Sequence, residues 1–190
     1  MVALGYLKPR LGGDSERVFR GAGRFSGAEA LQVGLGYDRG RFGGSLALEL
    51  ASPDVGERQA SALSLAALAH WYPRTRVLRS WQPVVSGGYV RHALGGIDIH
   101  SDDLPDFVIN TETSGAPPQM VEDVGLLGNG LRVGVGARRP LFRSGAFTFE
   151  ATGDLVSFSS VSSNGYESSV PAPGVSFIPR TSLGLAIWPF

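Results

Sequence analysis

LQVGLGYDRGRFGGSLALEL, residues 31–50, is the stretch that decides the fold. Large apolar residues alternate with small or polar ones on both sides of a short break at Asp38-Arg39-Gly40. A period of two around a glycine-containing turn predicts an antiparallel β-hairpin with one apolar face. In a soluble sandwich that face would form the core, whereas in a transmembrane barrel it would face lipid.

The composition limits the classes of protein to consider. The chain has 190 residues, and we expect one domain over residues 1–190. Its 17 basic and 17 acidic residues leave no net charge to attract nucleic acid. It contains no cysteine, which excludes disulfides, thiolate metal sites and cysteine catalysis. No apolar run reaches the roughly 20 residues of a membrane-spanning helix. No signal peptide is visible, and we expect that one has been removed from the mature chain.

The same alternation recurs along the chain and predicts eight strands. They are the two arms of the hairpin and 2–8, 59–72, 81–93, 121–137, 146–159 and 175–190. Segment 59–72 is also rich in the helix formers Ala and Leu, but its period of two favours a strand. The connections alternate between long and short, so all long ones lie at one end of an up-and-down array. That asymmetry is typical of an outer-membrane barrel and is not expected of a Greek-key sandwich.

Aromatic and basic residues gather at the end with the short turns. Aromatic residues there predict an interfacial girdle made of Tyr37, Phe42, Trp71, Tyr72, Trp81, Phe142, Phe147, Trp188 and Phe190. Arginines also lie in or beside the short turns, with only Asp38 opposing them: Arg39, Arg41, Arg74, Arg76, Arg79, Arg138, Arg139 and Arg143. Such turns could meet anionic phospholipid headgroups.

The eight-strand pattern ending in Phe190 resembles the small eight-stranded outer-membrane β-barrels of Gram-negative bacteria, the OmpA/OmpX/OmpW-like group. The last strand, 182–190, is similar to the C-terminal assembly signal of such proteins, although Gly184 is one residue out of register and Pro189 is unusual in the penultimate place. The resemblance implies an all-β, antiparallel, up-and-down transmembrane barrel in the bacterial outer membrane. It also implies contacts with outer-membrane lipid, lipopolysaccharide and the barrel assembly machinery.

Four charged residues fall on the predicted interior face of the strands: Glu49, Arg132, Glu150 and Asp154. The lumen of an eight-stranded barrel is just wide enough for side chains to fill, so charges there must be paired. We therefore predict a Glu49–Arg132–Glu150 network that plugs the lumen. A narrow polar path and a pair of catalytic carboxylates are the alternatives.

The sequence gives little support to a metal site or to the active site of a hydrolase. His70 and His92 lie towards opposite ends of the predicted barrel, so they should not share a metal ion. His100-Ser101 is similar to the His-x-Ser of outer-membrane lipid A deacylases, but Asp102 stands where the serine is expected. The acidic run from Asp98 to Asp106 could bind Ca²⁺ through oxygen ligands, yet it lacks EF-hand spacing. We expect no metal and no cofactor.

The long segment 94–120 is the strongest candidate for contact with another protein. Loops beyond about 12–15 residues are usually functional or disordered. A solvated loop gains nothing from apolar residues, so we predict a partner-binding loop at Leu104, Asp106, Phe107, Val108 and Ile109. The sequence thus predicts a non-enzymatic barrel that acts as a structural anchor or presents its loops, alone or as a subunit of a larger membrane complex. A narrow channel, a lipid A-modifying enzyme and a soluble lipocalin-like barrel are the alternatives.

Overall fold

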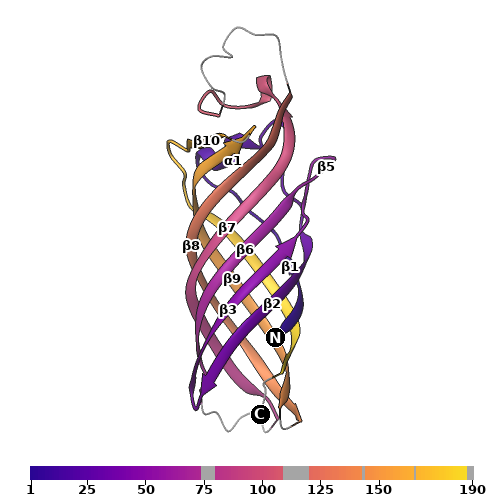
Figure 1. Cartoon of the computed structure of the whole chain (residues 1–190), viewed down its shortest axis with the longest axis vertical. Coiled ribbons are helices and arrows are strands. Elements are labelled where there is room, and N and C mark those ends of the chain that lie inside the picture. Colours follow the sequence, from indigo (N-terminus) through magenta and orange to yellow (C-terminus); the bar gives the residue numbers. More distant parts are fainter. Residues whose placement is uncertain (74–79, 109–119, 143, 165, 188–190) are drawn as a thin grey trace.

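The computed structural model describes residues 1–73, 80–108, 120–142, 144–164 and 166–187. Eight antiparallel strands form one closed ring in chain order, because the last strand pairs with the first (Figure 1). The strands are β1 (Val2–Leu7), β2 (Ala28–Arg39), β3 (Phe42–Ala51), β6 (Ser61–Trp71), β7 (Gln82–His100), β8 (Met120–Phe142), β9 (Gly145–Ser163) and β11 (Ser176–Ile187). The predicted up-and-down barrel is confirmed.

The hairpin of residues 31–50 forms as predicted. β2 and β3 pair in one register from Ala30↔Ala51 to Arg39↔Phe42, which leaves Gly40 and Arg41 in the turn. Gly40 has a φ of 67°, a left-handed conformation that glycine adopts without strain. The apolar residues of both arms therefore fall on the same face of the sheet.

That apolar face points outward. Leu35 is 81% exposed, whereas Ala47 on the opposite face of the same hairpin is 2% exposed. Exposed large side chains surround the barrel and define its apolar belt: Leu4, Leu31, Leu35, Leu46, Leu48, Leu65, Tyr89, Leu131, Val133, Val135, Leu155, Leu183 and Leu185. A continuous apolar exterior of this size is unusual for a soluble protein and is the arrangement of a transmembrane barrel. In the described parts of the chain, no helix is long and apolar enough to cross a membrane.

The segments predicted to be irregular contain more structure than expected. The first long loop carries helix α1 (Asp14–Val18), the second carries the small hairpin β4 (Asp54–Val55) and β5 (Arg58–Gln59), and the last carries β10 (Tyr166–Ser169). Segment 94–120 was predicted to be irregular from its first residue, but residues 94–100 form the end of strand β7. The strand continues to His100, and the short helix η1 (Ser101–Asp103) follows it. Gly95 and Gly96 have positive φ and lie at a register shift, so they interrupt the alternation without ending the strand.

The interior has two different layers. Beneath the long loops, α1 and the loop ends cover the barrel mouth with a buried apolar cluster that includes Val18, Phe19, Phe158 and Val161. Nearer the middle of the strands, the lumen is filled by polar and charged side chains. The candidate site lies in this second layer.

Candidate functional site

Five charged or titratable side chains from five strands meet inside the barrel: Glu49, His92, Arg132, Asp154 and Arg180. We call them the lumen charge cluster. Each occupies an inward position of its strand, and each is almost completely buried. Because neighbouring residues of a strand point to opposite faces, the strand alternation alone brings these side chains to the axis of the barrel.

Asp154 is the centre of the lumen charge cluster. Its Oδ1 accepts a hydrogen bond from Nε of Arg132 at 2.8 Å, and its Oδ2 accepts one from Nη2 of Arg132 at 3.0 Å. The same Oδ2 lies 2.7 Å from Nε2 of His92 and 2.8 Å from Nη2 of Arg180. A two-point arginine–carboxylate contact with further donors is among the stronger polar arrangements in proteins.

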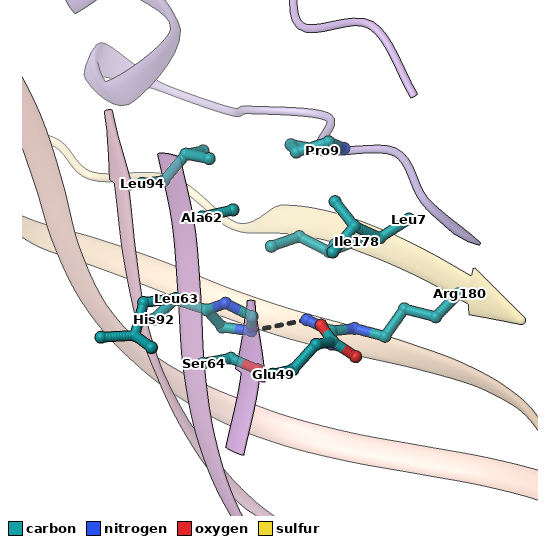
Figure 2. Close-up of a pocket in the computed structure, with 10 residues that line it drawn as sticks. All are labelled: Leu7, Pro9, Glu49, Ala62, Leu63, Ser64, His92, Leu94, Ile178 and Arg180. Carbon is teal, nitrogen blue, oxygen red and sulfur yellow. Dashed lines mark hydrogen bonds and ion pairs between the residues drawn. The ribbon is translucent and has the colours of Figure 1, made fainter. Parts of the chain in front are cut away.

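Arg180 connects Asp154 to the second carboxylate of the cluster. Its Nη1 forms an ion pair with Glu49, and its Nη2 lies 3.3 Å from Nε2 of His92 (Figure 2). Arg132 also donates a hydrogen bond from Nη2 to the hydroxyl of Ser64 at 3.3 Å. Two carboxylates therefore balance two guanidinium groups, which meets the requirement that buried charges be paired.

The pairing differs from the predicted Glu49–Arg132–Glu150 network. Arg132 and Asp154 are directly opposite in the register of β8 and β9, so they pair with each other. Glu49 pairs instead with Arg180, a residue that the sequence analysis did not select. Glu150 is half-buried in the next layer down, where its charge interacts with His70 and Arg132. Arg180 could have been found, because Ser176, Ile178 and Arg180 continue the inward alternation of β11.

A second polar group lies at the short-turn end of the barrel. The hydroxyl of Tyr72 donates to Oδ1 of Asp38 at 2.6 Å, and Arg138 donates to Oδ2 of Asp38 at 2.6 Å. The guanidinium of Arg138 also lies 3.8 Å from the centre of the Tyr72 ring. Burial and the bond to Asp38 raise the pKa of the Tyr72 phenol above its usual value.

The predicted aromatic girdle divides into outward and inward residues. Tyr37, Phe42, Trp71 and Phe142 are exposed at the short-turn end. Trp81 and Phe147 are half-buried and pack edge to face at 6.2 Å. Tyr72 was wrongly assigned to the girdle: it follows the outward Trp71 and therefore points inward, where it is 5% exposed. Trp188 and Phe190 lie outside the described residues.

The predicted partner-binding loop is partly used by the barrel itself. Leu104 and Val108 are buried in the apolar cluster of the mouth, and Phe107 packs against it. Asp106 is exposed, and Ile109 lies outside the described residues. Leu104 and Val108 are thus engaged within the chain, so partner binding by this loop stays a prediction that would rest on its exposed residues.

The three histidines considered for metal binding or catalysis lie in separate places. His70 hydrogen-bonds to Ser45 at 2.7 Å and is separate from the His92–Asp154 pair, whereas His100 is exposed at the end of β7. Within the described ranges, no group of three or more His, Cys, Asp or Glu side chains could hold a metal ion.

Comparison with known proteins agrees with this architecture. Neither a protein-family model nor a curated protein matches the sequence. Among solved structures, Neisserial surface protein A (NspA) is similar with a TM-score of 0.55 and 10% identity, over 98% of this chain and 94% of that chain. The outer membrane enzyme PagL is similar with a TM-score of 0.50 and 14% identity, over 100% of this chain and 99% of that chain. The chain therefore has the fold of the small outer-membrane β-barrels, as the sequence resemblance predicted.

Proposed function

We propose that this protein is a non-enzymatic, non-conducting barrel of the bacterial outer membrane that anchors and presents its long-loop end to a partner. The observation that carries the proposal is the lumen charge cluster, which fills the interior with mutually paired side chains. The apolar belt supports the membrane location, because such an exterior is stable only against lipid or another apolar surface.

The lumen leaves little space for a solute. The cavity beside Glu49, His92 and Arg180 has a volume of about 10 Å³, which is room for about one water molecule (Figure 2). Above it, the apolar cluster of Val18, Phe19 and Phe158 covers the mouth. A passing ion would have to separate buried ion pairs and then cross an apolar layer, and each step is costly.

The same burial argues against catalysis in the lumen. His92 and Asp154 form the kind of pair that serves acid–base chemistry, but they are 3% and 0% exposed. A general base must come within hydrogen-bond reach of its substrate, and the paired guanidinium groups occupy that space. PagL is an enzyme with this fold, but fold does not imply function.

The long-loop end of the barrel carries a projecting strand pair that is suited to contact with a partner protein. Beyond Ser61↔Gly95 and Gly125↔Ser162, β7 and β8 continue as a two-stranded ribbon that rises above the neighbouring strands (Figure 1). Its inner side is held to the mouth by Ile97, Ile99, Val121 and Val124, which are all buried. Its exposed positions include the acids Asp98, Glu122 and Asp123, and the exposed Asp102, Asp103 and Asp106 follow β7 in η1 and the adjoining loop. A ribbon of this kind is suited to a cationic partner surface.

Single-channel recording in planar bilayers tests the closed lumen. We expect the purified barrel at neutral pH to insert without discrete conductance steps, while a general porin in the same bilayer gives them. Discrete steps that persist across preparations would contradict the proposal and favour a narrow channel. Mass spectrometry of lipid A incubated with the same sample should show no change, and a mass shift that requires the protein would favour a lipid-modifying enzyme.

A further inference from the structure

The first long loop encloses a basic hollow on the barrel. The hollow has a volume of about 730 Å³ and lies between the end of β1 and the chain after α1. Its lining includes the basic residues Lys8, Arg10, Arg20 and Arg24 and the acid Glu16. Four basic side chains thus face one acid, although the whole chain has no net charge.

Two of these basic residues extend the outer wall of the barrel. The N–H of Lys8 donates to the carbonyl of Pro179 at 3.2 Å, and the N–H of Arg10 donates to that of Phe177 at 3.0 Å, so the β1–β11 ladder continues past Leu7. Lys8 and Arg10 are exposed in the same alternation as Leu4 and Tyr6. Along β1 and its continuation, the outward-facing residues therefore change from apolar to cationic toward the long-loop end. This change is expected where the acyl chains of the membrane end and the lipid headgroups begin.

The other two basic residues line the same hollow from the chain after α1. Arg20 and Arg24 are exposed and flank the turn after α1, above a floor to which the edge-to-face pair Phe19 and Phe25 contributes. In the ranges that the structure describes, neither these two arginines nor Lys8 and Arg10 form an ion pair. The lumen residues Arg132 and Arg180 are paired with carboxylates, whereas the four basic residues of the hollow are exposed and available to an external anion.

We propose that this hollow binds the phosphate group of a phosphorylated amphiphile from the surrounding outer leaflet. Guanidinium groups match phosphate oxygens with paired hydrogen bonds, which makes arginine the preferred side chain for such groups. The acyl chains would lie along the outward residues Leu4 and Tyr6, which continue below the cations, while the exposed Phe177 lies opposite Arg10. The inference goes beyond the proposed function, because a barrel without this site could still anchor and present its loops.

Binding of lipid A in mixed detergent micelles tests the site. We compare the doubly phosphorylated lipid, its fully dephosphorylated form and inorganic phosphate, each titrated against the intact barrel. Loss of a charge-assisted hydrogen bond weakens binding by about tenfold or more. We expect at least that loss for the double variant Arg20→Gln/Arg24→Gln and for the dephosphorylated lipid, and millimolar or weaker binding of inorganic phosphate.

Arg17→Gln is the matched control, because Arg17 lies in the same loop, pairs with Asp14 and does not line the hollow. It removes one positive charge from the same loop, half of what the double variant removes, and should change lipid affinity less than about twofold, since exposed pairs contribute little. Equal weakening by Arg17→Gln, or equal affinity for dephosphorylated lipid A, would overturn the site. Inorganic phosphate that binds as tightly as lipid A would overturn the lipid assignment and leave a site for a soluble anion. Urea titrations of both variants exclude loss of folding as the cause.

Discussion

Asp154→Ala is expected to lower the free energy of unfolding by about 3–5 kcal/mol, the cost of leaving buried charges without their partner. Asp154 contacts Arg132, Arg180 and His92, so its loss leaves the two guanidinium groups of the lumen charge cluster facing its one remaining carboxylate, Glu49. Urea titration of the detergent-folded barrel at neutral pH measures the effect. The exposed Asp54 is the control, and Asp54→Ala should stay within about 0.5 kcal/mol of the parent protein.

The order in which substitutions within the lumen charge cluster lower the free energy of unfolding is as informative as the size of each loss. Arg132→Ala leaves Asp154 with Arg180 and His92, so we expect it to cost less than Asp154→Ala. Two single substitutions of interacting residues should also fail to add in the double variant. If Asp154→Ala and Asp54→Ala are equally stable, the lumen charge cluster does not hold the interior together.

Leu46→Arg is expected to destabilise the barrel in lipid by about 2–4 kcal/mol, because it places a charge on the lipid face near mid-membrane. Leu46 is 60% exposed within the apolar belt. Phe42→Arg on the same strand and face is the matched control, since Phe42 begins β3 at the short-turn end. Near the interface the same change costs only about 0–1 kcal/mol. Refolding titrations into lipid vesicles give both values.

The difference in stability between the Leu46→Arg and Phe42→Arg variants is the decisive result. A barrel with this face in water would make no distinction by depth, because an exposed leucine there could be replaced at little cost. Equal stability of Leu46→Arg and Phe42→Arg would therefore reject the lipid-facing assignment of the apolar belt.

The barrel was predictable because its signal is local. Residues 31–50 alternate strictly, and the pairing of Leu35 with Leu46 follows from the position of Gly40 in the turn. The ends of β7 and β8 were harder to predict, because Gly95, Gly96 and Asp123 break the period at register shifts or positive φ. Such irregularities end a pattern in the sequence without ending the strand.

The lumen residues were predictable as a class, but their partners were not. Alternation places Glu49, Arg132 and Asp154 inside, whereas their pairing depends on the stagger between strands that are distant in sequence. The register sets Arg132 opposite Asp154, and ring closure by β11 brings Arg180 to Glu49. The basic hollow was also not predicted, because it depends on how the loop from Lys8 to Phe25 folds back on the end of β1.

Site-directed fluorescence quenching in lipid bilayers tests the central claim most directly. The chain contains no cysteine, so Val133→Cys introduces a single thiol for a fluorophore on the apolar belt. Asp102→Cys, at an exposed position of η1 just after β7, provides the aqueous reference. The account predicts that brominated acyl chains quench the label at position 133 and that iodide does not, with the reverse at position 102. Quenching of the label at position 133 by iodide, to the extent seen at position 102, would contradict a barrel that spans the membrane with this face in lipid.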